Sequence, residues 1–422
     1  MNRDCSLDPI QCGLPETVRP EPFDFAQESL VEGHDPTVLV VRQAHHERPN
    51  EQSGLNILMT STSYPESPQD WRGRFIANLA AALARREEIT LSLWAPPGEL
   101  PASVTAAATP DDALWLRHLS QQGGIAHLLR SRGMLAAGTV ASLLTRLGRA
   151  YRRQSADVAH VNWLQNALPL WGTRTPALIT VLGSDFGLLR LPGMKAGLRA
   201  VLRQRRAILA PNADWMRSGL EQAFGDLAEI RPITFGVDDP WFAITRRPPE
   251  DAHHWLAITR LTRNKVGDLF EWGEGLFGQD RQLHLFGPMQ EKIELPPWAQ
   301  YHGPTHPTEL LQTWFPQACG LITLSKHDEG RPQVVLEAMA AGLPVIASNL
   351  SAHRDIIQHR QTGWLVDSVD EFREALAMLE IPGHNQETGE AARTWIKANI
   401  GTWDDCAGRY AAAYRSLLEC KP

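Results

Sequence analysis

The stretch "GLITLSKHDEGRPQVVLEAMAAGLPVIAS" (Gly320–Ser348) decides the fold class. "GLITLS" is typical of a short buried strand, and "PVIAS" begins the next strand. Between them, "PQVVLEAMAA" predicts a helix of about three turns, because proline suits a first turn and Gly342 followed by Pro344 suits a helix end. Strand, helix and strand in this order predict a βαβ unit and therefore a parallel sheet.

The same alternation runs along most of the chain in two blocks. A segment rich in Pro, Asp and Arg, "FGVDDPWFAITRRPPEDAHH", separates them. We therefore expect two doubly wound sheets in tandem, with ligands at the carboxyl ends of the strands. The expected divisions are an N-terminal extension (1–53), a first Rossmann-like domain (54–235), a linker (236–252), a second Rossmann-like domain (253–385) and C-terminal helices (386–422) that end against the first domain.

Residues 1–53 show no sustained helical or strand period, which predicts either a disordered extension or a start codon assigned too early. The N-terminus lacks the apolar region of a signal peptide, and no apolar run of about 18 residues predicts a membrane-spanning helix. The five cysteines have no metal-site spacing. These features favour a globular cytoplasmic protein with reduced thiols.

The net charge of the chain is −7, yet one of its segments is strongly basic. Between Arg117 and Arg217 there are fifteen basic and three acidic side chains, which gives +12. Arg199, Arg203 and Arg206 recur at helical spacing within "GLRAVLRQRR" and predict a helix with one basic face. That face fits a solvated surface or contact with anionic lipid or an anionic acceptor, and the sequence leaves both open.

Glu337 lies within an otherwise apolar helix, and Glu329 lies in the loop before it. A lone ionised carboxylate in an apolar setting costs several kcal/mol unless it has a partner. That partner is either a basic side chain or the hydroxyl groups of a ligand. The nearby helix N-terminus favours phosphate. A ligand with both phosphate and hydroxyl groups is a nucleotide sugar.

Glu329, seven intervening residues and Glu337 closely resemble the signature of glycosyltransferase family 4, whose members are retaining enzymes of the GT-B fold. Further pieces resemble that family in the expected order along Leu55–Glu419. They are "LMTSTSYPESPQDWRGRFIANLAAALARR", "ITFGVD", "ITRLTRNK", "TGWLV" and "TWDDCAGRYAAAYRSLLE". The resemblance implies two Rossmann-like domains facing a central cleft.

The resemblance also implies roles for particular residues. Arg260 and Lys265 match the basic pair that grips the donor pyrophosphate, and Glu337 matches the acceptor of the ribose hydroxyls. Glu329 would hold a hydroxyl of the donor sugar next to the reacting carbon. Two glycines complete the donor site: Gly330 would contact sugar or phosphate through its backbone, and Gly73 would let the first loop approach both substrates.

The chain departs from the family pattern on the acceptor side. Many members have histidine where Leu182 and Asn162 stand, so the group that activates the acceptor is not identified. His160 and Asp185 are candidates for that role. Both also fit ordinary residues at strand ends whose hydrogen bonds are satisfied within the protein.

Together, these observations predict a metal-independent, retaining glycosyltransferase that uses a nucleotide-diphospho-sugar and needs no cofactor. Its acceptor would be a glycan or a lipid-linked molecule in cell-surface polysaccharide or lipopolysaccharide synthesis, and nucleic acid is not expected as a partner. The expected location is the cytoplasm, with the inner face of the cell membrane as an alternative. A nucleotide-sugar epimerase, a phosphorylase and a non-catalytic nucleotide-sugar-binding scaffold are the rival functions.

Overall fold

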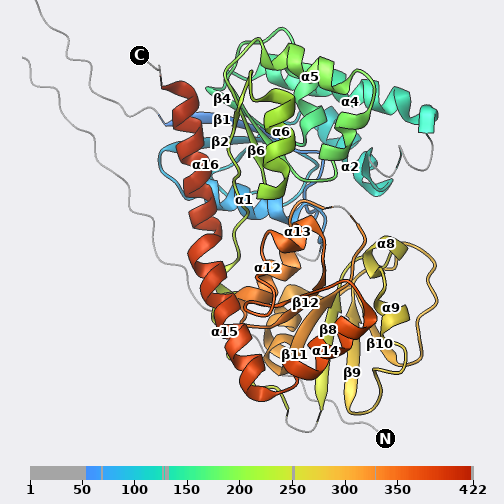
Figure 1. The fold of residues 1–422 in the computed structure, drawn as a ribbon. Helices are drawn as coiled ribbons and strands as arrows, with labels where there is room; N and C mark the ends of the chain where they lie inside the picture. Colours follow the sequence, from blue (N-terminus) through green and yellow to red (C-terminus); the bar gives the residue numbers. More distant parts are fainter. Residues whose placement is uncertain are drawn as a thin grey trace, which may run out of the picture. The chain divides into compact units, whose positions relative to one another are not determined.

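Two parallel sheets form the framework of the computed structural model (Figure 1). The structure describes residues 54–67, 70–125, 128, 133–249, 252–327 and 329–419. The expectation for residues 1–53 lies outside this part of the chain. Residues 52–422 form one compact unit.

The first sheet, called here the N-terminal sheet, has the strand order β3-β2-β1-β4-β5-β6-β7. Its strands are β1 (Leu55–Thr60), β2 (Ile89–Trp94), β3 (Thr105–Ala106), β4 (Val158–Asn162), β5 (Ala177–Val181), β6 (Ala207–Pro211) and β7 (Glu229–Ile230). Strands β4, β5 and β6 are buried along their whole length, as expected for a sheet covered on both faces.

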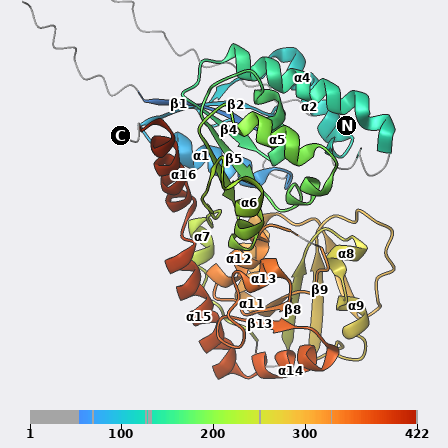
Figure 2. The same ribbon diagram turned by 45° about the horizontal axis from the view of Figure 1, so that its top comes forward.

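Helices cover both faces of the N-terminal sheet. They are α1 (Arg74–Ala84), α2 (Pro110–Gln121), α4 (Ala137–Arg153), α5 (Met194–Leu202) and α6 (Arg217–Phe224), with short 3-10 helices η1 (Gly133–Ala136), η2 (Leu164–Leu170), η3 (Phe186–Arg190) and η4 (Asp214–Met216). One apolar core lies under α2, α4, α5 and α6, and another lies under α1 and the last helix, α16 (Trp403–Leu418). Figure 2 shows α16 beside α1 and β1.

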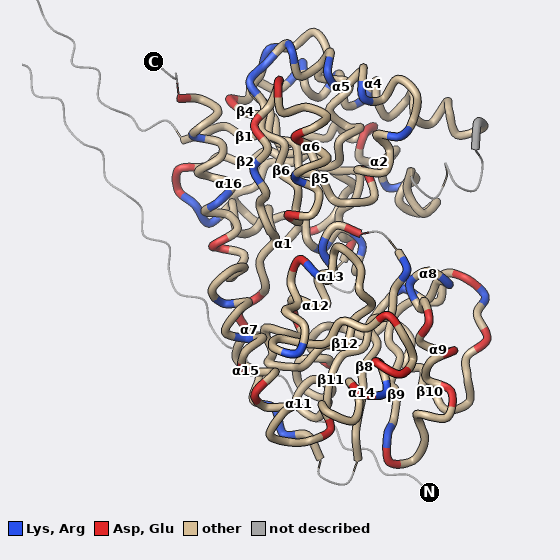
Figure 3. The backbone as a smooth tube through the Cα atoms, viewed as in Figure 1, with Lys and Arg blue, Asp and Glu red and all other residues tan. Residues whose placement is uncertain are grey.

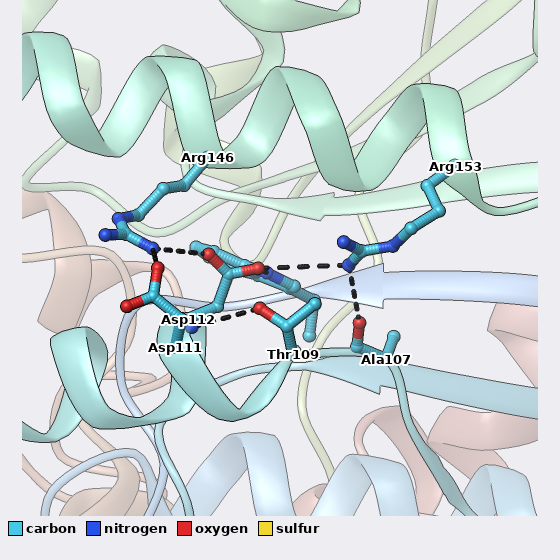
Figure 4. A network of polar contacts seen from close by, with 7 residues as sticks. Ala107, Thr109, Asp111, Asp112, Arg146 and Arg153 are labelled. Atoms are coloured by element: carbon cyan, nitrogen blue, oxygen red, sulfur yellow. Dashed lines mark hydrogen bonds and ion pairs between the residues drawn. The ribbon is translucent and has the colours of Figure 1, made fainter.

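A buried carboxylate joins α2 to α4 (Figure 4). Asp112 accepts hydrogen bonds from Arg146 Nη1 at 2.8 Å and from Trp94 Nε1 at 3.3 Å. Thr109 caps α2 by accepting a bond from the Asp112 backbone amide. The hydrogen bond from Arg146 helps hold the pKa of Asp112 below its usual value, against the effect of burial.

The second sheet, called here the C-terminal sheet, has the order β10-β9-β8-β11-β12-β13. Its strands are β8 (His253–Ile258), β9 (Arg281–Phe286), β10 (Ala299–Gly303), β11 (Ala318–Thr323), β12 (Val345–Ser348) and β13 (Trp364–Val366). All pairings are parallel. Both sheets and the βαβ alternation expected from the sequence are therefore confirmed.

The helices of the C-terminal part include the one predicted in the opening stretch. They are α7 (Asp239–Phe242), α8 (Arg263–Val266), α9 (Leu269–Trp272), α10 (Pro307–Glu309), η5 (Leu310–Trp314), α11 (Phe315–Gln317), α12 (Gln333–Ala340), α13 (Ser351–Arg354), α14 (Val369–Leu379) and α15 (Pro382–Asn399). Gly342 follows α12 with φ 69°, the left-handed conformation expected after a helix end.

The predicted basic helical face is wrong. Helix α5 ends at Leu202, so Arg203 and Arg206 lie beyond it. Arg199 pairs with Asp226, and Arg206 donates to the backbone oxygens of Glu419 and Ser416. These contacts explain why the spacing within "GLRAVLRQRR" does not produce one continuous face of arginines.

Candidate functional site

Arg260, Lys265 and Glu329 follow two neighbouring strands of the C-terminal sheet. Arg260 lies just after β8, Lys265 lies in α8, and Glu329 lies in the loop after β11. Because β8 and β11 are paired in parallel, their carboxyl ends lie at the same edge. The Lys265 Nζ atom donates to Glu329 Oε2 at 2.5 Å. The structure thus brings together two residues that the sequence placed in one donor site.

The ion pair between Lys265 and Glu329 is largely shielded from solvent, with side chains 12% and 18% exposed. Burial lowers the pKa of Lys265, Arg260 lowers it further, and Glu329 opposes both effects. Two cations therefore lie close enough to influence each other at this edge. Such an arrangement favours a polyanion such as a pyrophosphate.

The loop that carries Glu329 contacts the N-terminal part of the chain through Gly330. Trp215 Nε1, which follows β6, donates to the Gly330 carbonyl oxygen at 2.9 Å. The backbone of Gly183, which follows β5, lies so close that a Cβ atom there would be 2.1 Å from the Gly330 amide nitrogen. Gly330 therefore lies where loops from the two sheets meet, with its backbone already engaged by the protein.

A second contact between the two parts of the chain involves Asp355, which follows α13. Its carboxylate forms an ion pair with Arg331 and accepts a hydrogen bond from the Asp214 amide nitrogen at 2.9 Å. The Arg331 side chain is 4% exposed. The loop that carries Glu329 is thus held in place by contacts of Gly330 and of its neighbour Arg331. Trp215, Arg331 and Asp355 were not predicted from the sequence, because neither their residue type nor their spacing distinguishes them.

Gly73 is the residue before α1 and has φ 68°. A Cβ atom at this position would lie 2.6 Å from the Ser63 carbonyl carbon, so the close approach of these two loop segments requires glycine. Two residues earlier, the ring of Trp71 lies under the Arg260 guanidinium, 5.8 Å from ring centroid to Cζ. The loop before α1 therefore reaches the predicted donor site.

Glu337 lies on α12, apart from the contact between Lys265 and Glu329. Gln333, one turn earlier on the same helix face, donates to the Gly236 carbonyl oxygen at 2.8 Å. This hydrogen bond places the helix face that carries Glu337 against the segment that runs from Gly236 to Asp238. Within the described residues, the Glu337 carboxylate forms no ion pair. The salt bridge considered from the sequence is therefore not its partner here.

The surroundings of Glu337 raise its pKa to about 8. Part of its surface stays exposed, but enough protein surrounds the carboxyl group for burial to be the main cause. The negative charge of Asp238 adds to the rise, and Arg74 on α1 opposes it. A carboxyl group that is surrounded by protein and has no ion-pair partner gains hydrogen bonds when the hydroxyl groups of a ligand approach it.

His160 is fully buried within β4. Its Nδ1 atom lies 2.6 Å from the Tyr414 hydroxyl oxygen, and its Nε2 atom lies 2.9 Å from Thr180 Oγ1. Burial lowers its pKa to about 3. Both ring nitrogens are therefore used within the protein, which favours the alternative of an ordinary strand residue.

Asp185 organises the loop after β5. Its two carboxylate oxygens accept hydrogen bonds from the amide nitrogens of Leu182 and Leu164, each at 2.8 Å. Burial raises its pKa to about 6, although these backbone bonds oppose the rise. Because Gly183 lies in the same loop, Asp185 shapes the segment that meets Gly330. This geometry favours a positioning role over direct contact with an acceptor.

No helix among the described residues is long and apolar enough to cross a membrane. Across the same residues, no group of three or more His, Cys, Asp or Glu side chains has the arrangement of a metal site.

Comparison with known families identifies the segment that contains most of this site. Residues 261–380 match the family model described as "Glycosyl transferases group 1". A GDP-mannose-dependent alpha-(1-6)-phosphatidylinositol monomannoside mannosyltransferase of Mycobacterium tuberculosis is 42% identical over 100 residues, which cover 23% of this chain and 26% of that protein. A D-inositol 3-phosphate glycosyltransferase of Thermobispora bispora is 29% identical over 118 residues, covering 28% and 27%. The matched region thus spans about a quarter of the length of these relatives.

Solved structures resemble the chain over a longer range. Sucrose-phosphate synthase from Thermosynechococcus elongatus has a TM-score of 0.65 at 16% identity, covering 86% of this chain and 99% of that structure. Anabaena Alr3699/HepE in complex with UDP-glucose has a TM-score of 0.58 at 14% identity, covering 86% and 100%. The described chain therefore has the GT-B fold, and its residues 261–380 match the model of the glycosyl transferases group 1 family.

Proposed function

We propose that this chain is a retaining glycosyltransferase that moves a sugar from a nucleotide-diphospho-sugar to a glycan or lipid-linked acceptor. The contact between Lys265 and Glu329 is the observation that carries the proposal. It joins a cation suited to pyrophosphate and a carboxylate suited to sugar hydroxyls at one strand edge. The names of related proteins mention GDP-mannose and UDP-glucose, so these donors are tested first.

In this proposal, the bond between the anomeric carbon and the β-phosphate oxygen breaks while a bond to the acceptor hydroxyl oxygen forms on the same face, and the proton of that hydroxyl passes to the departing diphosphate. The departing diphosphate gains negative charge. Arg260, Lys265 and the N-terminus of α12 stabilise that charge. Glu329 positions the sugar through a hydroxyl, and Glu337 binds the ribose hydroxyls. Each of these groups belongs to the protein, so the proposed reaction needs no metal or cofactor.

The proposed acceptor class follows from the charge of the N-terminal part. Figure 3 shows basic residues around α4 and α5. Although Arg199 and Arg206 bond within the protein, other arginines such as Arg149 on α4 are exposed. A basic surface of this kind suits an anionic lipid-linked acceptor and peripheral contact with the inner face of the membrane. Cell-surface polysaccharide or lipopolysaccharide synthesis is the proposed setting.

The test is release of nucleoside diphosphate from UDP-glucose or GDP-mannose by the full chain, with a bacterial membrane extract as the source of acceptors. We expect release to require the extract, and NMR of the new glycoside to show the anomeric configuration of the donor. Inversion would contradict retention. Isomerisation of the donor sugar without transfer would instead support an epimerase.

A further inference from the structure

His353 is a fully buried side chain on α13, directly after β12. Strand β12 is the parallel neighbour of β11, so α13 begins at the same strand edge as the loop that carries Glu329. Neither the sequence motifs nor the proposed mechanism assigns a role to this histidine. Its surroundings define its protonation state and the kind of group that it can bind.

One ring nitrogen of His353 has a partner and the other does not. Nδ1 lies 2.7 Å from the Ser348 carbonyl oxygen, which can only accept, so the proton of the neutral ring is on Nδ1. Burial is the main effect on the pKa of His353 and lowers it, which favours this neutral form. Nε2 then carries a lone pair, and the described part of the chain offers it no hydrogen-bond donor. A buried acceptor without a donor is costly to the fold and calls for an explanation.

Hydrogen bonds connect His353 to the loop of Glu329. Ser348, whose carbonyl oxygen accepts the His353 proton, donates through its own hydroxyl to the Ser325 carbonyl oxygen at 2.6 Å. Ser325 Oγ in turn accepts from the amide nitrogen of His327, two residues before Glu329. His353 also lies close enough to Glu329 and Lys265 for Glu329 to raise its pKa and for Lys265 to lower it. The histidine is therefore linked to the loop of Glu329 by hydrogen bonds and lies within electrostatic reach of the ion pair.

The lone pair on Nε2 limits what it can bind. A phosphate oxygen at neutral pH is also an acceptor and is repelled, whereas a hydroxyl group can donate to it. Of the parts of a nucleotide-diphospho-sugar, the sugar is the part held beside Glu329 in the proposed function. We propose that His353 is a recognition residue for the donor sugar, whose Nε2 atom accepts a hydrogen bond from a sugar hydroxyl. This inference rests on the proposed function and extends it to a specificity-determining residue.

The proposal predicts that His353 affects binding of the sugar but not of the rest of the donor. His353 contributes to binding of a nucleotide sugar but not of the corresponding nucleoside diphosphate. Because Lys265 holds Glu329 in the free chain, the contact with Nε2 forms when the diphosphate draws Lys265 away and Glu329 turns to the sugar. Only a ligand with both parts then completes the site.

The experiment is calorimetric titration of the full chain with UDP and UDP-glucose, and with GDP and GDP-mannose. His353→Asn keeps an amide donor for the Ser348 carbonyl oxygen but has no atom at the position of Nε2. We expect it to bind the nucleotide sugar about 3- to 10-fold more weakly, the usual effect of one neutral hydrogen bond, with affinity for the nucleoside diphosphate within twofold of wild type. Equal losses for both ligands, or no loss for either, would overturn the proposal.

A measurement on the wild-type chain keeps the test independent of folding in the variant. In protein labelled with ¹⁵N-histidine, the Nε2 resonance of His353 should move farther on addition of the nucleotide sugar than with the nucleoside diphosphate, which changes only the position of Lys265. Equal movement with both ligands would mean that the sugar does not donate to Nε2, and the proposal would be wrong. If the wild-type chain binds no nucleotide sugar, the proposed function itself fails. Normal binding with a fixed resonance contradicts this inference alone.

Discussion

The Nζ atom of Lys265 donates to Oε2 of Glu329 at 2.5 Å, so the two residues expected to bind different parts of the donor bind each other in the free chain. A diphosphate must therefore compete with Glu329 for Lys265. The same exchange would release Glu329 to the sugar. This competition makes the effects of replacing the two residues differ in sign.

Replacing Glu329 with alanine should reduce turnover strongly but should not weaken binding of the bare nucleoside diphosphate. Loss of the carboxylate frees Lys265 from a largely shielded ion pair. We expect tighter binding of UDP or GDP by about two- to fivefold in calorimetry. Weaker diphosphate binding in Glu329→Ala would show that Glu329 does not compete for Lys265.

Replacing Glu337 with glutamine should weaken nucleotide binding by about 1.5–3 kcal/mol, because an amide cannot replace a charged acceptor to two hydroxyls. Since the pKa of Glu337 is about 8, binding to the ionised form should release protons at neutral pH. Calorimetry in buffers of different ionisation enthalpy would detect this release in the wild type. Unchanged nucleotide affinity in Glu337→Gln would make Glu337 a structural residue.

The same carboxyl group should destabilise the fold at alkaline pH. Its pKa is raised from 4.5 to about 8, so the folded state binds its proton more tightly than the unfolded state. Its stabilising contribution is full below pH 4.5 and is lost as pH rises through about 8. The melting temperature of Glu337→Gln should therefore match wild type near pH 4.5 and exceed it by a few degrees at pH 8.5. A constant difference across this range would mean that the carboxyl group titrates normally.

The sheets could be predicted from the sequence because buried strands are continuous apolar runs and the helices between them end at recognisable residues. Thr402 illustrates this: it directly precedes the last helix and forms a capping box with Asp405. The end of α5 could not be predicted. Arginine favours helices, but the buried Arg205 turns back to donate to the Leu170 carbonyl oxygen at 2.8 Å.

The site was only partly predictable from the sequence, because its contacts join residues that are far apart along the chain. Lys265 and Glu329 are 64 residues apart, so their contact depends on the pairing of β8 with β11 rather than on sequence spacing. The family resemblance named both residues but not their mutual bond. His160 was a site candidate because many family members have a histidine nearby, where Asn162 stands, yet one of its partners is Tyr414, 254 residues away on α16. No local pattern signals such a partner.

The contact between Gly183 and Gly330 offers a test of how the two parts of the chain meet. Gly183 has φ 92°, and an added Cβ would lie 2.1 Å from the Gly330 amide nitrogen. Gly183→Ala should lower turnover about tenfold or more by displacing the loop of Glu329. Gly187→Ala is the matched control, because its Cβ would meet no atom within 4 Å. Equal turnover in both variants would show that the contact is dispensable.

The basic surface of the N-terminal part should bind anionic vesicles in a salt-sensitive manner. Replacing the exposed residues Arg149, Arg174 and Arg203 with glutamine should reduce co-sedimentation with phosphatidylglycerol vesicles by roughly 1 kcal/mol per arginine at low salt. The control replaces exposed basic residues of the C-terminal part: Lys292, Arg373 and Lys397. If the wild type stays in the supernatant at low salt, the membrane proposal fails.

The most direct test of the donor site is calorimetric titration of nucleoside diphosphates into the wild type and Lys265→Met, after a thermal-shift screen of UDP-, GDP-, ADP- and dTDP-sugars has named the base. Lys292→Met, which removes an exposed lysine outside the predicted donor site, is the control. We predict saturable binding by wild type and control, and a loss of about 1.5–3 kcal/mol in Lys265→Met. Binding of the diphosphate with equal affinity by all three proteins would contradict a donor site at Lys265 and Glu329.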